Sequence, residues 1–165
     1  MASGIVYHGA SSWAAVAGIA VWPVLEYVMH RWVFHATPRN KVSRVLLYAM
    51  HGMHHAFPGD RYRLVLPLTL SVLWAGMYML ACTWFMSSPT ALVFTAGTAS
   101  AYALYDVTHY VIHHMHTVRR WRVFAAAKQR HINRHHMGDD WDANFGITTG
   151  ALDAVARCVG VYKSD

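Results

Sequence analysis

The strongest constraint on this chain is the segregation of its charged residues along the sequence. All fourteen lysines and arginines fall in two stretches, 31–63 and 119–163. Between them, the 23 residues Leu64–Met86 carry no formal charge, and Pro89–Tyr105 is also uncharged. At about 1.5 Å per residue, a helix of roughly 20 residues crosses a hydrocarbon core of about 30 Å. Because Ser87–Thr90 is a polar, proline-containing turn, the sequence predicts a helical hairpin through a bilayer.

A third apolar segment precedes the hairpin and carries tryptophans at positions that suit membrane interfaces. No basic residue comes before it, unlike in a cleavable signal peptide, so we expect a retained anchor. We therefore predict an all-α integral membrane protein with a single domain over 1–165 and three transmembrane helices, at about 13–32, 64–86 and 90–112. The positive-inside rule places the basic segments 33–63 and 113–165 in the cytoplasm, as a histidine-rich helical cap.

The charge pattern also restricts the class of protein. Only 13% of the residues are charged, against roughly a quarter in an ordinary soluble domain. A net charge of +6 would fit a nucleic-acid-binding protein. However, the cations flank apolar segments instead of alternating with aromatic residues on a polar face, so we expect no nucleic acid partner. A soluble helical protein with a very apolar core is the alternative to a membrane protein.

Histidine is the anomalous residue type, with thirteen copies. Eleven of them form four groups, all on the predicted cytoplasmic side. The groups are His30 and His35; His51, His54 and His55; His109, His113 and His114; and His131, His135 and His136. His8 and His116 stand outside these patterns, and we treat both as non-ligands.

Histidines three or four residues apart lie on one face of an α-helix. Each of three sets is therefore predicted to point in one direction: His51/His54/His55, His109/His113 and His131/His135. Adjacent histidines point about 100° apart, so the two members of a pair can serve different ions. The number of imidazoles exceeds what one ion binds, and the pattern indicates two metal ions. Imidazole suits zinc, copper, iron and nickel, so the ligand type alone does not choose the metal.

Two carboxylates lie inside the apolar segments, each one helical turn from a histidine. Glu26 precedes His30 by four residues, and Asp106 precedes His109 by three. A ligand histidine usually donates its second ring N–H to a carboxylate or a carbonyl. We therefore expect Glu26 and Asp106 to orient ligand histidines without binding the ions themselves. His114 points away from the face of His109, and we expect it beside the ions without binding them.

These segments resemble the fatty acid hydroxylase superfamily, membrane di-iron enzymes that include fatty acid 2-hydroxylases, sterol desaturases and carotene hydroxylases. The matching segments are Glu26–His35, His51–His55, Tyr105–His114 and His131–Asp153. The third segment and the Asn144–Thr149 tail are most similar to the fatty acid 2-hydroxylase branch. The resemblance implies metal-ligand roles for His30, His35, His51, His54, His55, His109, His113, His131, His135 and His136. The fourth histidine group, His131 to His136, differs from the family's more usual H-x2-H-H spacing by one extra residue after His131.

The resemblance also implies a function. It indicates an O2-dependent hydroxylase with two iron ions that inserts a hydroxyl group into a C–H bond of a membrane lipid, a fatty acyl chain above all. Zinc can replace iron in purified protein, because zinc forms the more stable complexes. Neither a glycine-rich dinucleotide motif nor a C-x-x-C motif is present, so a separate donor, cytochrome b5-like or a ferredoxin with its reductase, would supply electrons. The excess of arginine over lysine favours a bacterial inner membrane.

Other functions remain open at this point. A lipid or sterol desaturase, or a carotenoid ring hydroxylase, would use the same di-iron site. A histidine-rich membrane metal-binding or transport protein would place its ligands near the bilayer midplane, whereas these histidines lie at cytoplasmic ends. A bis-histidine cytochrome would leave most of the groups unexplained.

Overall fold

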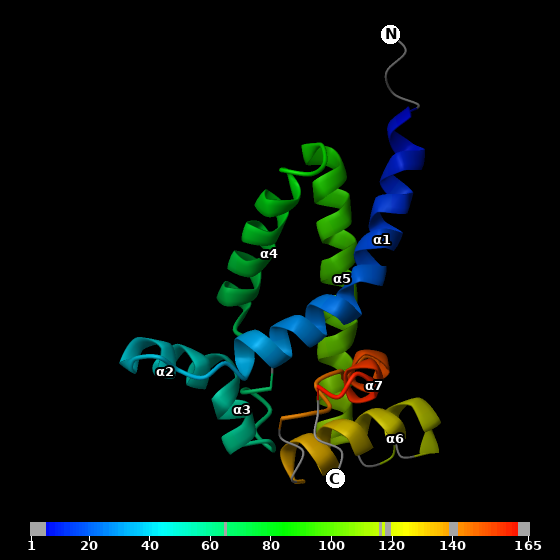
Figure 1. The fold of residues 1–165 in the computed structure, drawn as a ribbon. Helices are drawn as coiled ribbons and strands as arrows, with labels where there is room; N and C mark the ends of the chain where they lie inside the picture. Colours follow the sequence, from blue (N-terminus) through cyan, green and yellow to red (C-terminus); the bar gives the residue numbers. More distant parts are fainter. Residues whose placement is uncertain (1–5, 65, 116, 118–119, 139–141, 162–165) are drawn as a thin grey trace. The chain divides into compact units, whose positions relative to one another are not determined.

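The fold is a set of helices, seen in a computed structural model (Figure 1). The structure describes residues 6–64, 66–115, 117, 120–138 and 142–161; His116 and the side chain of His8 lie outside this description. No strand occurs in the described ranges, which confirms the predicted all-α class. The helices are α1 (Val6–Val28), η1 (Met29–Phe34), α2 (Lys41–Leu47), η2 (Tyr48–Gly52), α3 (Met53–Ala56), α4 (Leu68–Cys82), α5 (Ser88–His114), α6 (Arg122–Lys128), η4 (Gln129–His136) and α7 (Ala151–Cys158).

The chain divides into two compact units. The first comprises Met1–Trp22 and Leu66–Leu104, and the second comprises Pro23–Val65 and Tyr105–Asp165. Helices α1 and α5 each contribute residues to both units. The histidine groups all belong to the second unit.

In the first unit, α1 and α5 approach each other through glycines. A Cβ atom on Gly18 would lie 2.1 Å from the carbonyl oxygen of Phe94, and one on Gly97 would lie 2.2 Å from that of Ala15. The Thr98 hydroxyl donates a hydrogen bond to the Gly18 carbonyl at 3.1 Å. Small residues at a helix crossing permit this backbone approach, which a side chain at either position would prevent.

Helix α4 and the start of α5 form a hairpin in the same unit (Figure 1). The Ser71 hydroxyl lies 3.3 Å from the Tyr102 hydroxyl, and the Tyr78 and Phe94 rings stack with centroids 6.1 Å apart. Helix α4 ends at Cys82 and α5 begins at Ser88, so the connection falls close to the predicted 87–90 turn.

One segment of the described chain, Ser12–Phe34, is long and apolar enough to cross a membrane by length and composition. It overlaps the predicted span 13–32. Helix α4 is apolar but has 15 residues, fewer than the predicted span 64–86. Helix α5 has 27 residues and includes the predicted span 90–112. The arrangement with three transmembrane helices stays a prediction.

We expect Gly97→Ala to destabilise the fold by about 1–3 kcal/mol, because the new Cβ would meet the Ala15 carbonyl and force the helices apart. Gly76 is the matched control, since a Cβ there meets nothing within 4 Å. Gly76→Ala should be neutral or stabilising by about 0.5–1 kcal/mol, as for an ordinary helical glycine. Thermal unfolding in detergent measures both variants, and equal midpoints would contradict the close helix contact.

The second unit is packed around a non-helical segment near the C-terminus, residues 143–148, which we call the strap. Its Phe145 and Ile147 side chains are almost completely buried. Phe145 belongs to a core cluster with Tyr27, and Ile147 belongs to a second cluster with Ile112. The strap therefore lies in the core of this unit instead of on its surface.

Candidate metal centre

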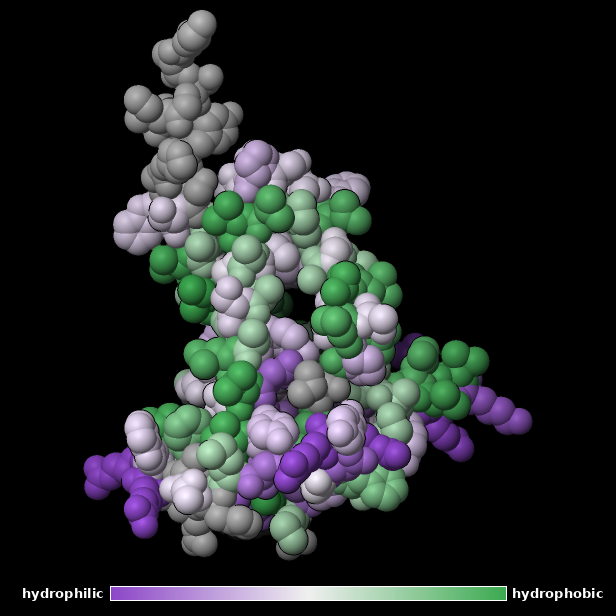
Figure 2. Space-filling view, turned by 180° about the vertical axis from the view of Figure 1, so that it is seen from behind, coloured by the Kyte–Doolittle hydropathy of each residue, from purple (hydrophilic) through white to green (hydrophobic). Residues whose placement is uncertain are grey.

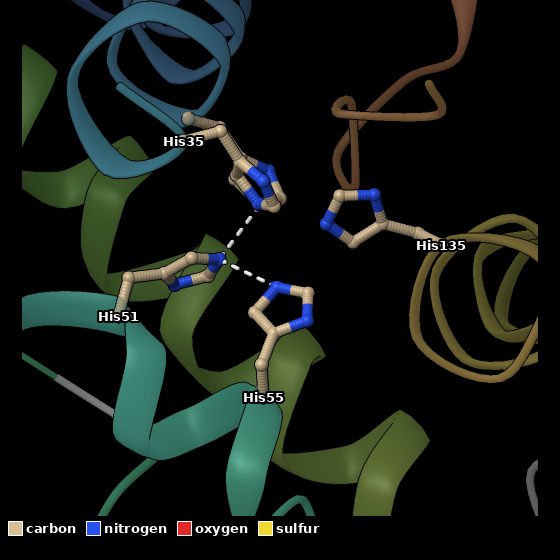
Figure 3. Close-up of side chains that lie close together, drawn as sticks. His35, His51, His55 and His135 are labelled. Carbon is tan, nitrogen blue, oxygen red and sulfur yellow. Dashed lines mark hydrogen bonds between the residues drawn. The ribbon is translucent and has the colours of Figure 1, made fainter. Parts of the chain in front are cut away.

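Nine of the ten predicted ligand histidines lie in two groups. Within each group the candidate ligand atoms all lie within 4.8 Å of one another. Group A consists of His30, His35, His51, His55 and His135, and group B consists of His54, His113, His131 and His136. Figure 3 shows four group A imidazoles pointing toward one another from the end of η1, from η2, from α3 and from η4.

The tenth histidine, His109, adjoins group B. Its Nε2 atom lies 3.1 Å from Nε2 of His54 and 2.7 Å from Nε2 of His131, and its side chain is buried. The two groups are also in contact, because the rings of His55 and His136 stack with centroids 4.1 Å apart. All ten histidines thus form one double cluster with five imidazoles on each side.

Neighbouring histidines separate between the two groups. His54 belongs to group B and His55 to group A, and His136 belongs to group B and His135 to group A. This division follows from the angle of about 100° between adjacent side chains around a helix. That the two members of each pair bind different ions stays a prediction.

The predicted set His51/His54/His55 is divided, because His54 lies in group B and the other two lie in group A. The prediction for His131 and His135 is also wrong, because they belong to different groups. The reason is that η4 is a π-helix, in which each N–H bonds to the carbonyl five residues earlier instead of four. A π turn takes one more residue than an α turn, so His131 shares its group with His136. The same geometry joins His30 and His35, where the His35 N–H donates to the His30 carbonyl at 3.1 Å. The π-helix therefore accommodates the extra residue between His131 and His135.

Backbone carbonyls fix the orientation of three histidines through their Nδ1–H groups. The bonds run from His30 to the Phe145 carbonyl at 2.7 Å, from His135 to the Ala143 carbonyl at 2.8 Å and from His113 to the Pro58 carbonyl at 3.0 Å. A carbonyl oxygen only accepts, so the ring proton must lie on Nδ1. The Nε2 atom of each neutral ring then keeps a lone pair for a ligand role.

The donor set fits metal ions. Within the described ranges, buried Nε2 atoms without a hydrogen-bond partner include those of His35, His113, His135 and His136. In group A, the Nε2 atom of His51 lies 3.1 Å from that of His30 and 3.0 Å from that of His55. Two nitrogens bound at right angles to one ion, each at about 2.1 Å, would lie about 3.0 Å apart. Because buried polar atoms without partners are costly, bound cations explain this arrangement.

The environment keeps these imidazoles neutral. Burial, reinforced by neighbouring imidazoles, lowers the pKa of His55 to about 3 and the pKa of His54 to about 2. Burial likewise puts the pKa of His51 and of His131 well below the usual range. An imidazole must be unprotonated to bind a metal ion. The groups are therefore prepared to bind cations at neutral pH.

A fully buried carboxylate, Asp153 in α7, holds the strap. It accepts the backbone N–H of Phe145 at 2.9 Å and that of Gly146 at 2.8 Å. The carbonyl of Phe145, which orients His30, lies in the same turn of chain. Asp153 is thus connected to a group A imidazole through the backbone.

Glu26, which we expected behind His30, also acts on the strap. Its carboxylate accepts the backbone N–H groups of Ile147 and Thr148. The ring N–H of His30 donates to a strap carbonyl in place of the Glu26 carboxylate. Glu26 therefore supports the histidine indirectly, by fixing the segment that supplies its acceptor.

Two arginines complete the hydrogen bonding of the strap. Arg130 donates to the Ile147 carbonyl at 3.2 Å, and Arg157 donates to the Asn144 side-chain oxygen at 3.1 Å. Asn144 has a positive φ of 61°, a left-handed conformation that asparagine adopts more readily than most residues. The strap is thus fixed by charged side chains as well as by the burial of its apolar residues.

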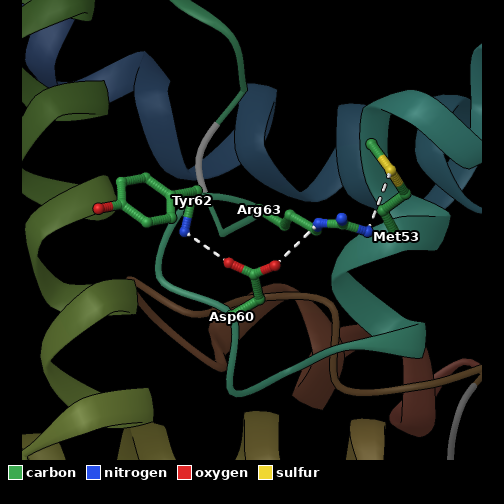
Figure 4. A network of polar contacts seen from close by, with 4 residues as sticks. All are labelled: Met53, Asp60, Tyr62 and Arg63. Carbon is green, nitrogen blue, oxygen red and sulfur yellow. Dashed lines mark hydrogen bonds and ion pairs between the residues drawn. The ribbon is translucent and has the colours of Figure 1, made fainter.

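The loop after α3 supplies the carbonyl that orients His113, and it is braced by its own side chains (Figure 4). Asp60 accepts the backbone N–H of Tyr62 at 3.0 Å and pairs with Arg63 at 2.8 Å. Arg63 also donates to the Met53 sulfur at 3.8 Å. This network ties the loop back to α3, the helix that carries one histidine of each group.

The other two predicted supporting residues lie on α5. Asp106 is half-buried, one turn before His109. His114 lies outside both groups, with its ring centroid 4.6 Å from that of Tyr110. Sequence reasoning missed Asp153 and Arg130 as supports. An acidic residue among the apolar positions of the tail was the available signal for Asp153, whereas backbone carbonyls leave no signal in a sequence.

Comparison with known proteins gives the family. The fatty acid hydroxylase family profile matches residues 15–157. Dihydroceramide fatty acyl 2-hydroxylase FAH1 of Arabidopsis thaliana is 35% identical over 149 residues, covering 90% of this chain and 61% of the relative. Fatty acid 2-hydroxylase of Homo sapiens is 30% identical over 138 residues, covering 82% of this chain and 36% of the relative.

A solved structure of full-length Scs7p, with only the hydroxylase domain visible, resembles this fold. The TM-score is 0.76 at 28% sequence identity, and the match covers 93% of this chain and 56% of that chain. The chain spans less than two thirds of the length of each of these three proteins. With a family profile that covers most of its length, the chain belongs to the fatty acid hydroxylase family.

Proposed function

We propose that this protein is an O2-dependent di-iron hydroxylase that inserts a hydroxyl group into a C–H bond of a fatty acyl chain in a membrane lipid. The pair of histidine groups, five of whose nine members are buried, is the observation that carries the proposal. Relatives with the names fatty acyl 2-hydroxylase and fatty acid 2-hydroxylase support it. Unactivated C–H bonds resist the acid, base and nucleophile chemistry of side chains, so a hydroxylase of this kind needs a metal and O2.

In this proposal group A holds one iron ion, and group B with His109 holds the other. When bound, the two ions supply the activation of O2 that the reaction requires. Nitrogen donors suit iron, and zinc can take the same positions in purified protein. Two electrons come from a separate donor protein, cytochrome b5-like or a ferredoxin with its reductase.

The chain's own residues hold and shield the site. The carbonyls of Phe145, Ala143 and Pro58 keep the ring protons on Nδ1 and turn the Nε2 lone pairs inward. The burial of His30, His51, His54, His131 and His135 limits the access of water to both groups, which favours neutral imidazoles.

We further propose that the chain is a multi-pass protein of a bacterial inner membrane, with the histidine groups on the cytoplasmic side. The apolar segment Ser12–Phe34 supports the first of three spans. Exposed apolar side chains on the hairpin, such as Leu80 and Trp84, would contact lipid. The confinement of lysine and arginine to the two segments that flank the hairpin supports the orientation.

Lipid mass spectrometry with 18O2 tests the reaction. In cells that express the chain with its electron donor, we expect a new acyl species that has gained one 18O atom. A variant with alanine at both His54 and His55 should give none, because it removes a ligand from each group. Loss of two hydrogens without added oxygen would instead show a desaturase. Metal flux without any lipid change would show a transport protein, and either result would refute the proposal.

A further inference from the structure

Helix α2 has an apolar face that no other part of the described chain covers. Val42, Val45 and Leu46 are spaced so that they share one side of the helix. Their side chains are 67%, 67% and 55% exposed, and no α2 residue is buried. A shallow groove is lined by these residues and Lys41. On the molecular face drawn in Figure 2, hydrophobic side chains gather on α2 beside hydrophilic ones.

The charges around this face are all positive. Arg39, Lys41 and Arg44 are exposed, and no acidic residue occurs between Glu26 and Asp60. Near an anionic membrane surface, each basic residue strengthens binding by about fivefold. An apolar face bordered by basic residues is the pattern of a helix that lies in the plane of a membrane interface.

Local hydrogen bonds cap the beginning of α2. The Asn40 side chain accepts the Ser43 N–H at 2.8 Å, and the Ser43 hydroxyl accepts the Asn40 N–H at 3.0 Å, which forms a capping box. Helix α2 is the first part of a continuous helical run through η2 and α3 to Ala56, and none of its own residues is buried by the described chain. In proteins most helical stability comes from packing of an apolar face. A surface that covers Val42, Val45 and Leu46 would supply this packing.

We propose that the apolar face of α2 docks on the headgroup boundary of an anionic lipid bilayer. Val42, Val45 and Leu46 would enter the acyl boundary, while Lys41 and Arg44 reach anionic headgroups. We choose a lipid surface because an apolar helix face bordered only by basic residues is the pattern of an interfacial helix, and because the chain has a segment apolar enough to cross a membrane. This site is independent of the di-iron proposal, because α2 contains no histidine.

Fluorescence quenching tests the docking in the full chain, reconstituted in vesicles of phosphatidylcholine and phosphatidylglycerol. An environment-sensitive label is placed at Val45→Cys after replacement of Cys82 and Cys158. Arg44→Cys is the matched site, one residue along the same helix and about 100° around it. We expect nitroxide on the upper acyl chain to quench the Val45 label more than the Arg44 label, and iodide to show the reverse order. Equal access of iodide to both sites would overturn the proposal, and so would a Val45 label shielded from both quenchers, which would indicate a protein partner.

A charge variant tests the lipid preference. In the labelled chain, a higher fraction of phosphatidylglycerol should raise the ratio of docked to undocked α2. Replacing both basic residues, Lys41→Gln and Arg44→Gln, should lower that ratio by roughly 25-fold at low salt. Metal content should stay unchanged, because neither residue lies in group A or group B. An unchanged phosphatidylglycerol dependence would contradict the electrostatic part of the proposal. Loss of metal or of hydroxylation with normal docking would count against the di-iron function alone.

Discussion

Replacing His54 with alanine is expected to empty group B, abolish hydroxylation and lower the metal content from about two ions per chain to about one. The Nε2 atom of His54 lies 3.1 Å from that of His109, and its ring centroid lies 4.8 Å from that of His113. Removal of an outer support typically costs 10- to 100-fold in metal affinity or activity, so loss of a ligand should cost more. Elemental analysis of the purified chain measures the metal content.

His55→Ala and His114→Ala make this prediction specific. His55 belongs to group A, so its loss should also leave about one ion, and the His54→Ala/His55→Ala double variant should bind none. If both histidines held the same ion, the double variant would keep the second ion. His114 is adjacent to His113 but lies outside both groups, so His114→Ala should keep both ions. Metal loss in His114→Ala equal to that in His54→Ala would show that the assignment to groups is incorrect.

Short-range periodicity explains what could be predicted of this site. Histidine spacing along single helices was sufficient to anticipate two groups of imidazoles, but it set His54 in one direction with His51 and His55, from which the structure separates it. It failed for His131 and His135, because α-helical geometry was assumed where the chain forms a π-helix. π turns are rare and occur mostly at functional sites, so the periodicity of an ordinary α-helix does not anticipate them.

Contacts between distant residues were beyond sequence reasoning. The bond from His30 to the Phe145 carbonyl joins positions 115 residues apart, and its acceptor is backbone. Glu26 showed the same limit: its spacing suggested a contact with His30, but its partners are N–H groups on the strap, more than 100 residues away. A residue's position on a helix indicates its direction, whereas the tertiary fold decides which groups it meets.

Replacing Asp153 with asparagine is expected to weaken metal binding selectively in group A, by about 10- to 100-fold. One carboxylate now accepts two backbone N–H groups, from Phe145 and Gly146. An asparagine oxygen can keep one of these bonds, but its NH2 group would face the other N–H as a second donor. The strap carbonyls that orient His30 and His135 would then shift, and both histidines belong to group A. Group B should change less, because the carbonyl that orients His113 comes from the loop after α3.

Single-group backgrounds separate this effect from a general loss of stability. In His54→Ala, the remaining ion reports on group A, and adding Asp153→Asn should remove it at limiting metal. In His55→Ala, the remaining ion reports on group B and should largely survive the same change. Gly97→Ala is the stability control, since it disturbs a helix crossing in the first unit and should leave both ions bound. If Asp153→Asn weakened both groups equally, or no more than Gly97→Ala at the same fall in thermal midpoint, Asp153 would have only a structural role. Selective loss from group A would show that the Asp153 carboxylate, which holds the strap through the N–H groups of Phe145 and Gly146, controls the metal affinity of this group.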